Sequence, residues 1–268
     1  MKMAIHGVFY NLPDSPIILA NNSVGNGTTI TASSSAPGFP VAALKNPLTY
    51  ERWMPNSPSG GSFEISLPNA PIDTIAFAAH SMGTTGSLLK MEVYNGAWEL
   101  FFDYGGLPVA LDDSPYVLVF GVDLVAAGYT KLRISIDKQA EIGVVYAGKR
   151  LEMPLSIYGG RTPDTIGRDT DIKTARSVSG NFLGRTVVRR GYEARYEFKH
   201  LGAAWYRSHF EPFAKDAITN PFIIAWYPSK YPEEVIYGWV EQDIVGRNMG
   251  VRDFMETSFT VKAIGDGQ

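Results

Sequence analysis

Histidines are the side chains best suited to acid–base or metal chemistry in this chain, and there are four of them: His6, His80, His200 and His209. None lies in an H-x-H or H-E-x-x-H spacing, which would bring two imidazoles onto one metal ion. His80 directly precedes Ser81, but neighbours on a strand point to opposite faces, so we expect no nucleophile–base pair there. The sequence also has no G-x-S-x-G elbow. These patterns predict neither a catalytic residue nor a metal site.

Paired carboxylates could support a different chemistry, because two acids suffice for glycoside hydrolysis. Asp112 and Asp113 precede a Ser-Pro dipeptide, where we expect their side chains to form Asx turns. Asp164, Asp169 and Asp171 lack the spacing of a calcium-binding loop and its bidentate glutamate, so a solvated loop is the favoured interpretation. A glycan-cleaving enzyme is therefore only a weak functional hypothesis for this chain. It would require two acids about 5–10 Å apart in a cleft.

Arginines and tyrosines gather in one stretch of the second half. This set comprises Arg185, Arg189, Arg190, Tyr192 and Arg195. On antiparallel strands, Arg189 and Arg190 would flank a turn at Gly191. One interpretation is a solvated hairpin whose arginines pair with neighbouring glutamates. The other is a subunit interface, where arginine and tyrosine are enriched. The residue types leave both interpretations open.

Composition excludes several classes of protein and cofactor. The 268 residues include no cysteine, which excludes disulfides, thiolate-bound zinc and iron–sulfur clusters. The run Val24-Gly25-Asn26-Gly27 lacks a third glycine and a P-loop lysine, so we expect no bound nucleotide. We expect no other cofactor either. The net charge of −3 argues against a nucleic-acid partner. Without an apolar run of about 18 residues or a signal-like N-terminus, we expect a soluble protein made without Sec export and no membrane insertion.

Charge is divided unevenly along the chain. Residues 1–155 carry nine basic and thirteen acidic side chains, a net charge of −4. Residues 156–268 carry fifteen basic and fourteen acidic side chains, a net charge of +1. The near balance in the arginine-rich half favours ion pairs at an interface over a track for polyphosphate.

Short strands at regular spacing dominate the first half. Phe63, Ile65 and Leu67 alternate with polar residues, and Asn95-Gly96 is a strong hairpin turn. The expected strands are 63–67, 72–80, 88–94, 98–102, 116–120, 131–136 and 142–147. With no convincing helix among them, residues 36–155 are predicted to form a β-sandwich or jelly roll.

The second half, residues 156–268, mixes strands with one helix. The expected strands are 172–179, 185–190, 193–199, 221–227, 234–240 and 255–264. Tyr206, Phe210, Phe213 and Ala217 form one apolar stripe, which predicts a helix near 203–218. Pro212 within it must kink or split that helix. The fold class is therefore mainly β, with a C-terminal antiparallel α+β domain behind the N-terminal sandwich.

The first 35 residues are predicted to hold one strand and an extended arm. Residues 21–40 are rich in glycine, serine, threonine and asparagine, which is typical of a long loop. Such an arm is suited to reaching across a subunit boundary. The next boundary is placed at the turn-forming stretch 154–162, across which we expect few side-chain contacts.

A longer pattern runs from residue 40 to residue 80. Its parts are Pro40-Val41-Ala42-Ala43-Leu44-Lys45-Asn46-Pro47, Arg52-Trp53, Phe63-Glu64-Ile65-Ser66-Leu67, Ile72-Asp73-Thr74-Ile75-Ala76 and His80. This pattern resembles discoidin-like, galactose-binding-like jelly rolls, in the version found in virion proteins of tailed phages. Such domains bind sugars, lipids or proteins through loops at one end of the barrel. The resemblance implies a ligand-binding rim that consists of Arg52, Trp53, His80, Ser81 and Tyr104. The alternative for Trp53 is that its side chain fills the core of the domain.

The order of elements in the second half is similar to that of tail-tube and distal-tail proteins of bacteriophages. The resemblance implies a structural virion protein of the tail tip or baseplate, made in the host cytoplasm and catalysing no reaction. Copies of the chain would assemble as a ring, such as a hexamer. The ring would contact other tail proteins, such as tube and hub, and would display the jelly roll outward. The alternative hypothesis is a carbohydrate-binding module that contacts a host glycan, with stacking aromatics and a few polar donors as its site.

Overall fold

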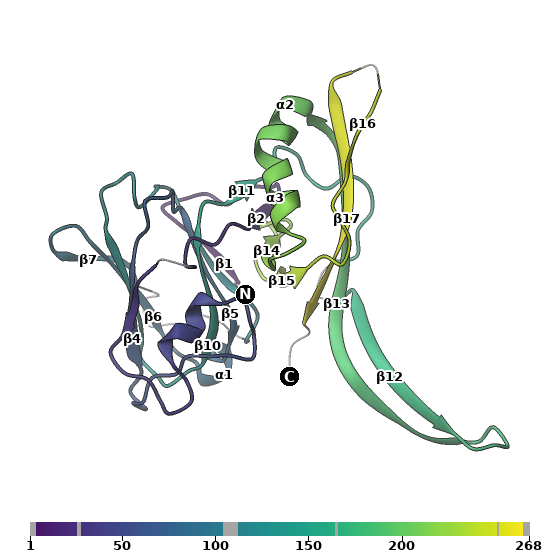
Figure 1. The fold of residues 1–268 in the computed structure, drawn as a ribbon, viewed down its shortest axis with the longest axis horizontal. Coiled ribbons are helices and arrows are strands. Elements are labelled where there is room, and N and C mark those ends of the chain that lie inside the picture. Colours follow the sequence, from purple (N-terminus) through teal and green to yellow (C-terminus); the bar gives the residue numbers. More distant parts are fainter. Residues whose placement is uncertain (1–3, 26–27, 104–111, 164–165, 251, 265–268) are drawn as a thin grey trace.

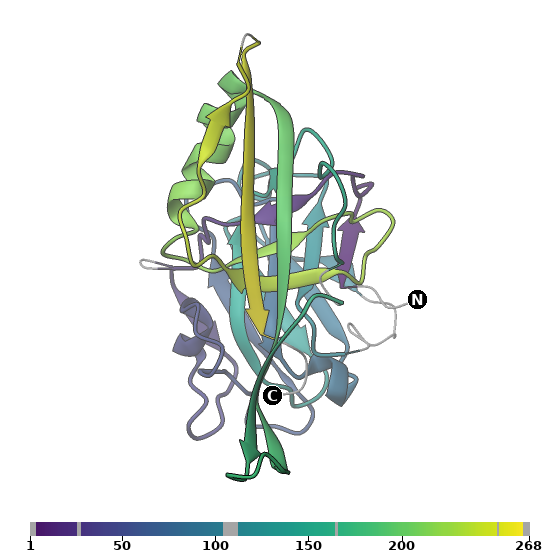
Figure 2. The ribbon, with the colours of Figure 1, turned by 90° about the vertical axis from the view of Figure 1, so that its right-hand side faces the viewer.

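The computed structural model describes residues 4–25, 28–103, 112–163, 166–250 and 252–264 (Figures 1 and 2). The described chain forms three β-sheets and one longer helical segment. The prediction of a mainly β fold, with a sandwich first and an antiparallel part with one helix after it, is confirmed.

Two of the sheets face each other and form the N-terminal jelly roll. The five-stranded sheet has the order β3 (Ile30–Ala32), β4 (Gly61–Ser66), β9 (Lys131–Ile136), β6 (Leu89–Tyr94) and β7 (Trp98–Asp103). The four-stranded sheet has the order β1 (Ile5–Val8), β8 (Tyr116–Phe120), β5 (Thr74–His80) and β10 (Ile142–Gly148). Two short helices, η1 (Val41–Lys45) and α1 (Met82–Thr85), lie in the connections.

The sequence patterns of the two sheets differ because their surroundings differ. In β4, β6 and β9 buried and partly exposed residues alternate, as expected for a sheet with one face on a core and one toward solvent. All residues of β8 and β10 are buried, and so are six of the seven in β5. The four-stranded sheet is therefore covered on both faces.

The third sheet builds the second half of the molecule. Its order is β11 (Leu151–Glu152), β2 (Ile17–Leu19), β14 (Phe222–Ala225), β15 (Val235–Trp239), β17 (Phe254–Ile264), β13 (Phe182–Gly202) and β12 (Arg168–Arg176), with β16 (Gly246–Asn248) also paired to β17. Figure 1 shows the helical segment packed on one face of the long β13–β17 pair, while β12 and the first part of β13 project beyond the body.

The predicted helix is present as three consecutive parts, α2 (Ala203–Trp205), the π-helical turn η2 (Tyr206–Phe210) and α3 (Glu211–Asp216). The stripe of Tyr206, Phe210, Phe213 and Ala217 is buried against the sheet, as predicted. Pro212 lies at the start of α3, directly after the wide turn. A proline has no N–H to give to the preceding turn, so the wide turn is where the helix accommodates it.

The expected turn at Gly191 is wrong. β13 is a single strand of 21 residues that passes straight through this position. A Cβ at Gly191 would meet Ala263 O at 2.9 Å and Asp169 O at 3.3 Å, because β12 and β17 both reach β13 here. Gly191 therefore allows three strands to approach one another closely, and it does not mark a turn. The reversal lies at the tip of β12–β13, where Ser177 N–H donates to Asn181 O and Gly180 has a φ of +84°.

The N-terminal segment differs from the expected extended arm. It contributes β1 to the four-stranded sheet, β2 to the third sheet and β3 to the five-stranded sheet. Between them, the Asn22 side chain accepts hydrogen bonds from Val24 N–H and Ala147 N–H, and it donates to Val145 O. Its polar residues thus anchor the loop to β10 by side-chain hydrogen bonds, which composition alone does not distinguish from a free loop.

The two halves have separate cores that are joined by a third cluster. Ile65 belongs to the jelly-roll core and Phe222 to the core under the helix. Between them, the outer face of the four-stranded sheet packs on the third sheet. This joint consists of Ala4, Ile5, Ile17, Leu19, Ala76, Val117, Val119, Tyr146, Ile223, Ala225 and Val235. The joint explains why β5, β8 and β10 are apolar on both faces.

Removing the ring of Trp53 should strongly destabilise the jelly roll. Trp53 is fully buried, packs edge-on against Phe63, and its indole N–H donates to Ser34 O at 3.1 Å. We expect Trp53→Ala to lower the free energy of unfolding by about 3–5 kcal/mol, measured by urea denaturation. As a control, Tyr50→Ala, at a ring that is 74% exposed, should change it by no more than about 0.5 kcal/mol. Equal effects of the two substitutions would contradict the burial described here.

Candidate functional site

An ion pair forms at one end of the jelly roll because two loops are held together by a short bridge. Trp53 and Ile142 exchange both backbone hydrogen bonds, at 2.8 and 2.9 Å. Because this bridge is antiparallel, the residues that precede them, Arg52 and Glu141, are diagonal neighbours, and the long arginine side chain spans the diagonal, so that Arg52 Nη1 is 2.6 Å from Glu141 Oε2. Both side chains are 31% exposed. A guanidinium and a carboxylate are thus fixed at the solvent boundary.

Of the predicted rim residues, Arg52 is the one whose charged group meets solvent. Trp53 lies in the core and cannot stack on a ligand. Ser81 joins the loops from beneath, since its N–H donates to Glu141 O and its Oγ accepts Glu141 N–H at 2.9 Å. Tyr104 lies outside the described residues.

His80 ends β5 below this rim and is 3% exposed. Its Nδ1 accepts Met82 N–H at 3.3 Å, which fixes the neutral tautomer with the proton on Nε2. Burial lowers the pKa of His80 from 6.5 to about 4, although the carboxylate of Asp113 opposes that shift. The imidazole is therefore neutral near pH 7 and part of the packing. It is not placed to move protons at the rim.

Tyr50 is a rim residue that the sequence patterns did not identify. It lies two residues before Arg52, and its ring is 74% exposed. The guanidinium of Arg52 also donates from Nε to Thr49 O, so the turn that carries Tyr50 is tied to the ion pair. An exposed aromatic ring on the same loop as a fixed pair of polar groups provides the types of group that small-molecule sites use.

A second candidate site is the arm, by which we mean residues 168–190 of β12, its turn and the first part of β13. Figures 1 and 2 show it as a two-stranded ribbon that leaves the body. None of its residues is buried. Its exposed apolar side chains are Ile172, Val178, Phe182, Leu183, Val187 and Val188. The arm therefore presents apolar surface that nothing in the described chain covers.

The predicted interface residues are divided between the arm and the sheet. Arg185, Arg189 and Arg190 lie on the arm, where Arg189 pairs with Asp169 at 2.6 Å. Tyr192 lies where the arm meets the body, and it packs against the core under the helix. Arg195 lies on the open face of β13, with a side chain 68% exposed and 3.9 Å from Glu197.

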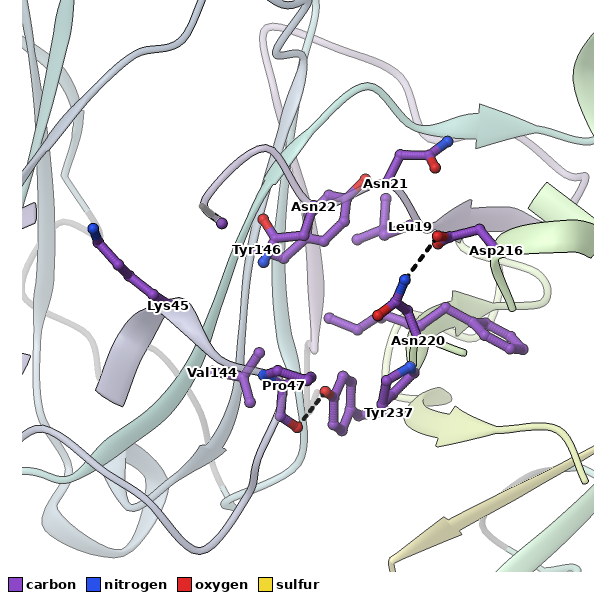
Figure 3. A pocket seen from close by; sticks show the side chains of 14 residues that line it. Leu19, Asn21, Asn22, Lys45, Pro47, Val144, Tyr146, Asp216, Asn220 and Tyr237 are labelled. Carbon is purple, nitrogen blue, oxygen red and sulfur yellow. Dashed lines mark hydrogen bonds between the residues drawn. The ribbon is translucent and has the colours of Figure 1, made fainter. Parts of the chain in front are cut away.

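A small cavity lies at the joint between the halves (Figure 3). Its volume is about 210 Å³, which is below the range of about 300–1,000 Å³ that is usual for ligand pockets. Its polar groups serve the joint. Asn220 donates to Asp216 at 2.7 Å, Tyr237 donates to Pro47 O at 2.8 Å, and the buried Tyr146 hydroxyl donates to Ala20 O. Burial accordingly raises the pKa of Tyr146.

Within the described ranges, no group of three or more histidine or acidic side chains is placed to hold a metal ion. In the same ranges, no helix has the length and apolar character needed to cross a membrane.

Comparison with known proteins gives only distant likenesses. No family model matches the chain, and no curated protein matches it. Similar solved structures include CpGH89CBM32-6 from Clostridium perfringens, at 14% identity over 46% of this chain and 94% of that one, with a TM-score of 0.37.

Two further solved structures are similar to this chain to the same degree. The family 32 carbohydrate-binding module of C. perfringens NanJ, in complex with galactose, is 12% identical over 46% of this chain and 93% of that one, with a TM-score of 0.37. A pectin-binding module is 15% identical over 45% of this chain and 89% of that one, with the same TM-score. Likenesses this distant carry no argument about ligand or activity, and none of those compared supports the tail-tube resemblance of the second half.

The neutral, buried His80 should make the protein less stable as the pH falls. The unfolded chain binds a proton near pH 6.5, whereas the folded chain binds it only near pH 4. The contribution of His80 is therefore complete above pH 6.5, and about 3 kcal/mol of it is lost between pH 6.5 and 4. His80→Asn can still accept Met82 N–H and does not titrate, so its unfolding free energy should fall less over this range.

Urea denaturation of both proteins at pH 7, 5.5 and 4 measures this difference. Carboxylates that titrate in the same range contribute equally to both proteins and cancel. Parallel pH profiles would contradict a buried, neutral His80.

Proposed function

We propose that this protein binds carbohydrate, without catalysis, at the loop end of its jelly roll. The observations that support this function are the exposed Tyr50 ring and the Arg52–Glu141 pair, which starts two residues further along the same loop. His80, the imidazole at this end, is buried and neutral, so it is not available for proton transfer to a ligand at the rim.

The chemistry of the rim suits a sugar. The C–H face of a pyranose is apolar and packs on an aromatic ring, while its hydroxyl groups need both donors and acceptors. In the described chain, protein groups engage Nε and Nη1 of Arg52, which leaves further N–H donors of the five in a guanidinium. The carboxylate of Glu141 supplies acceptors, and its pairing with Arg52 keeps both groups in place before a ligand arrives.

Tyr50→Ala should weaken sugar binding while the fold is retained. The substitution removes the stacking surface from an exposed position, so we expect affinity for a bound sugar to fall by at least about tenfold. Tyr50→Phe keeps the ring and should bind nearly as well as the unmodified protein. A glycan array identifies the ligand, and calorimetry compares the variants.

Leu100→Ala is the matched control, because Leu100 is 59% exposed on β7 and should leave affinity unchanged. A sugar affinity that Tyr50→Ala leaves unchanged would rule out this rim. The absence of any array signal for the unmodified protein would rule out the function.

The second candidate function is that of a structural subunit that associates with copies of itself. The observation that favours it is the arm, since an isolated two-stranded ribbon is only marginally stable in water. Exposed strand edges and apolar side chains are also a liability that proteins usually cover. Contact with another copy would remove both problems.

The tailed-phage assignment is a finer form of this second candidate. A ring of copies at the tail tip or baseplate, contacts with tube and hub proteins, location in the virion and the lack of a nucleic-acid partner all remain predictions. They rest on the sequence resemblance and composition alone.

Shortening the arm should prevent association and leave the body folded. Asp171 and Arg189 are opposite partners in the ladder, so residues 172–188 can be replaced by an Asn-Gly turn of two residues. None of the removed residues is buried, so the melting temperature should change little. We expect light scattering after size exclusion to give an oligomer for the unmodified protein and a monomer for the shortened variant. The same oligomer for both would exclude the arm as the contact.

A further inference from the structure

We propose that the arm of one copy docks on the acidic body of a second copy, and not on the arm of that copy. The contact is then head-to-tail. This inference rests on the association of copies proposed above, and it specifies which two surfaces meet.

The first step concerns the strand edges that the chain leaves open. In the body, the outer edge of β13 is covered by the preceding segment, since Tyr158 N–H donates to Glu197 O at 2.8 Å and Glu193 N–H donates to Gly167 O at 2.7 Å. In the arm this cover is missing. β12 has no further partner strand in the described chain, and the pairing of β13 with β17 ends at Gly191. The arm therefore offers backbone donors and acceptors as well as apolar side chains to a partner.

The second step concerns charge. The arm carries six basic residues, Arg168, Lys173, Arg176, Arg185, Arg189 and Arg190, and two acidic ones, Asp169 and Asp171, so its net charge is +4. The whole chain has a net charge of −3, which leaves −7 on the remainder. Arg176, Arg185 and Arg190 are exposed and form no ion pair with any residue that the structure describes. The arm and the body of two copies thus have opposite charges.

The third step excludes the symmetric alternative. Two arms that paired edge to edge would bring together two segments that each carry six basic and two acidic residues. Like charges opposite each other destabilise a ladder, and two arms of +4 repel each other at longer range. Docking on the body instead places the arginines against an excess of acids, which favours encounter and fixes the orientation.

The fourth step concerns reach. Nine residues of β13, from Phe182 to Arg190, lie beyond the last position paired to β17. At about 3.3 Å per residue, they extend about 30 Å, which is close to the diameter of a small domain. The arm is therefore long enough to cross a subunit boundary. Because the donor and acceptor surfaces differ, such contacts form a ring if the rotation closes and a filament if it does not.

A mixing experiment separates head-to-tail docking from arm–arm pairing. The shortened variant, with residues 172–188 replaced by Asn-Gly, retains an acceptor body and has no arm to donate. The chain has no cysteine, so Ala204→Cys on the exposed face of the helical segment carries one fluorescent dye. Sedimentation velocity follows the labelled shortened variant as unlabelled, unmodified protein is added.

Head-to-tail docking predicts that the labelled variant sediments with the unmodified protein and that the mean size of the assemblies decreases as its share rises, because it terminates each chain. If the labelled variant stays at the monomer position while the unmodified protein remains oligomeric, the docking mode is wrong and the association stands. A monomeric unmodified protein would overturn the association and the docking mode together.

Charge reversal gives a second, independent test, because the same change should affect association differently on the arm and on the body. Arg185→Glu lowers the charge of the arm and should weaken association at least tenfold at low salt, with less difference at high salt. Arg207→Glu makes the same change on the body, at an exposed position of the helical segment, and should leave association unchanged or strengthen it. Equal weakening by both substitutions would overturn the charge pairing proposed here.

Discussion

The four-stranded sheet β1–β8–β5–β10 is apolar on both of its faces, and the rest of the structure depends on this double burial. One face closes the jelly-roll core, and the other packs on the third sheet. Each face excludes water from a continuous apolar surface, which contributes roughly 25 cal/mol per Å² buried. A joint of this kind differs from the polar interfaces that allow domains to move. The loop end of the jelly roll and the third sheet, from which the arm projects, are consequently held in one fixed relation.

Polar groups at the joint reinforce this relation without creating a binding site. The hydroxyls of Tyr146 and Tyr237 each donate to a backbone carbonyl, and the Asn22 side chain is used on both its oxygen and its nitrogen. Buried polar groups that lacked such partners would cost about 1–3 kcal/mol each. The small cavity in Figure 3 is thus a remnant of two imperfectly matched surfaces.

Sequence patterns predicted where the strands and the helix lie better than they predicted which strands pair with each other. The alternation in β4 and the stripe from Tyr206 to Ala217 are local signals, and the structure has both elements where they were expected. The length of β13 was not predictable, because glycine usually marks a turn and Gly191 serves a meeting of three strands instead. Strands β1 and β2 pair with residues more than 100 positions away, such as Val117 and Ile223, and no local pattern reveals these partners.

The candidate sites show the same division between local and distant information. Arg52 was predicted from its motif, but its partner Glu141 is 89 residues further along, and only the bridge between Trp53 and Ile142 brings them together. Trp53 illustrates the opposite case, since a tryptophan next to a loop can plug the core as well as it can stack on a ligand. The exposure of Tyr50 and of Phe182 on the arm is a property of the folded surface. Residue type alone gives no measure of it.

The two proposed functions support each other in energetic terms. A rim with one ring and one ion pair is shallow, and the contacts of a single sugar with it are few. Copies that are held together by their arms would present several such rims, and the second binding event would then be intramolecular. Avidity can exceed a single affinity by factors of roughly 10²–10⁴ when the geometry allows simultaneous contact. In Figures 1 and 2 the arm and the α1 end of the jelly roll point toward the same end of the molecule, so the contact between copies would itself set how the rims are spaced.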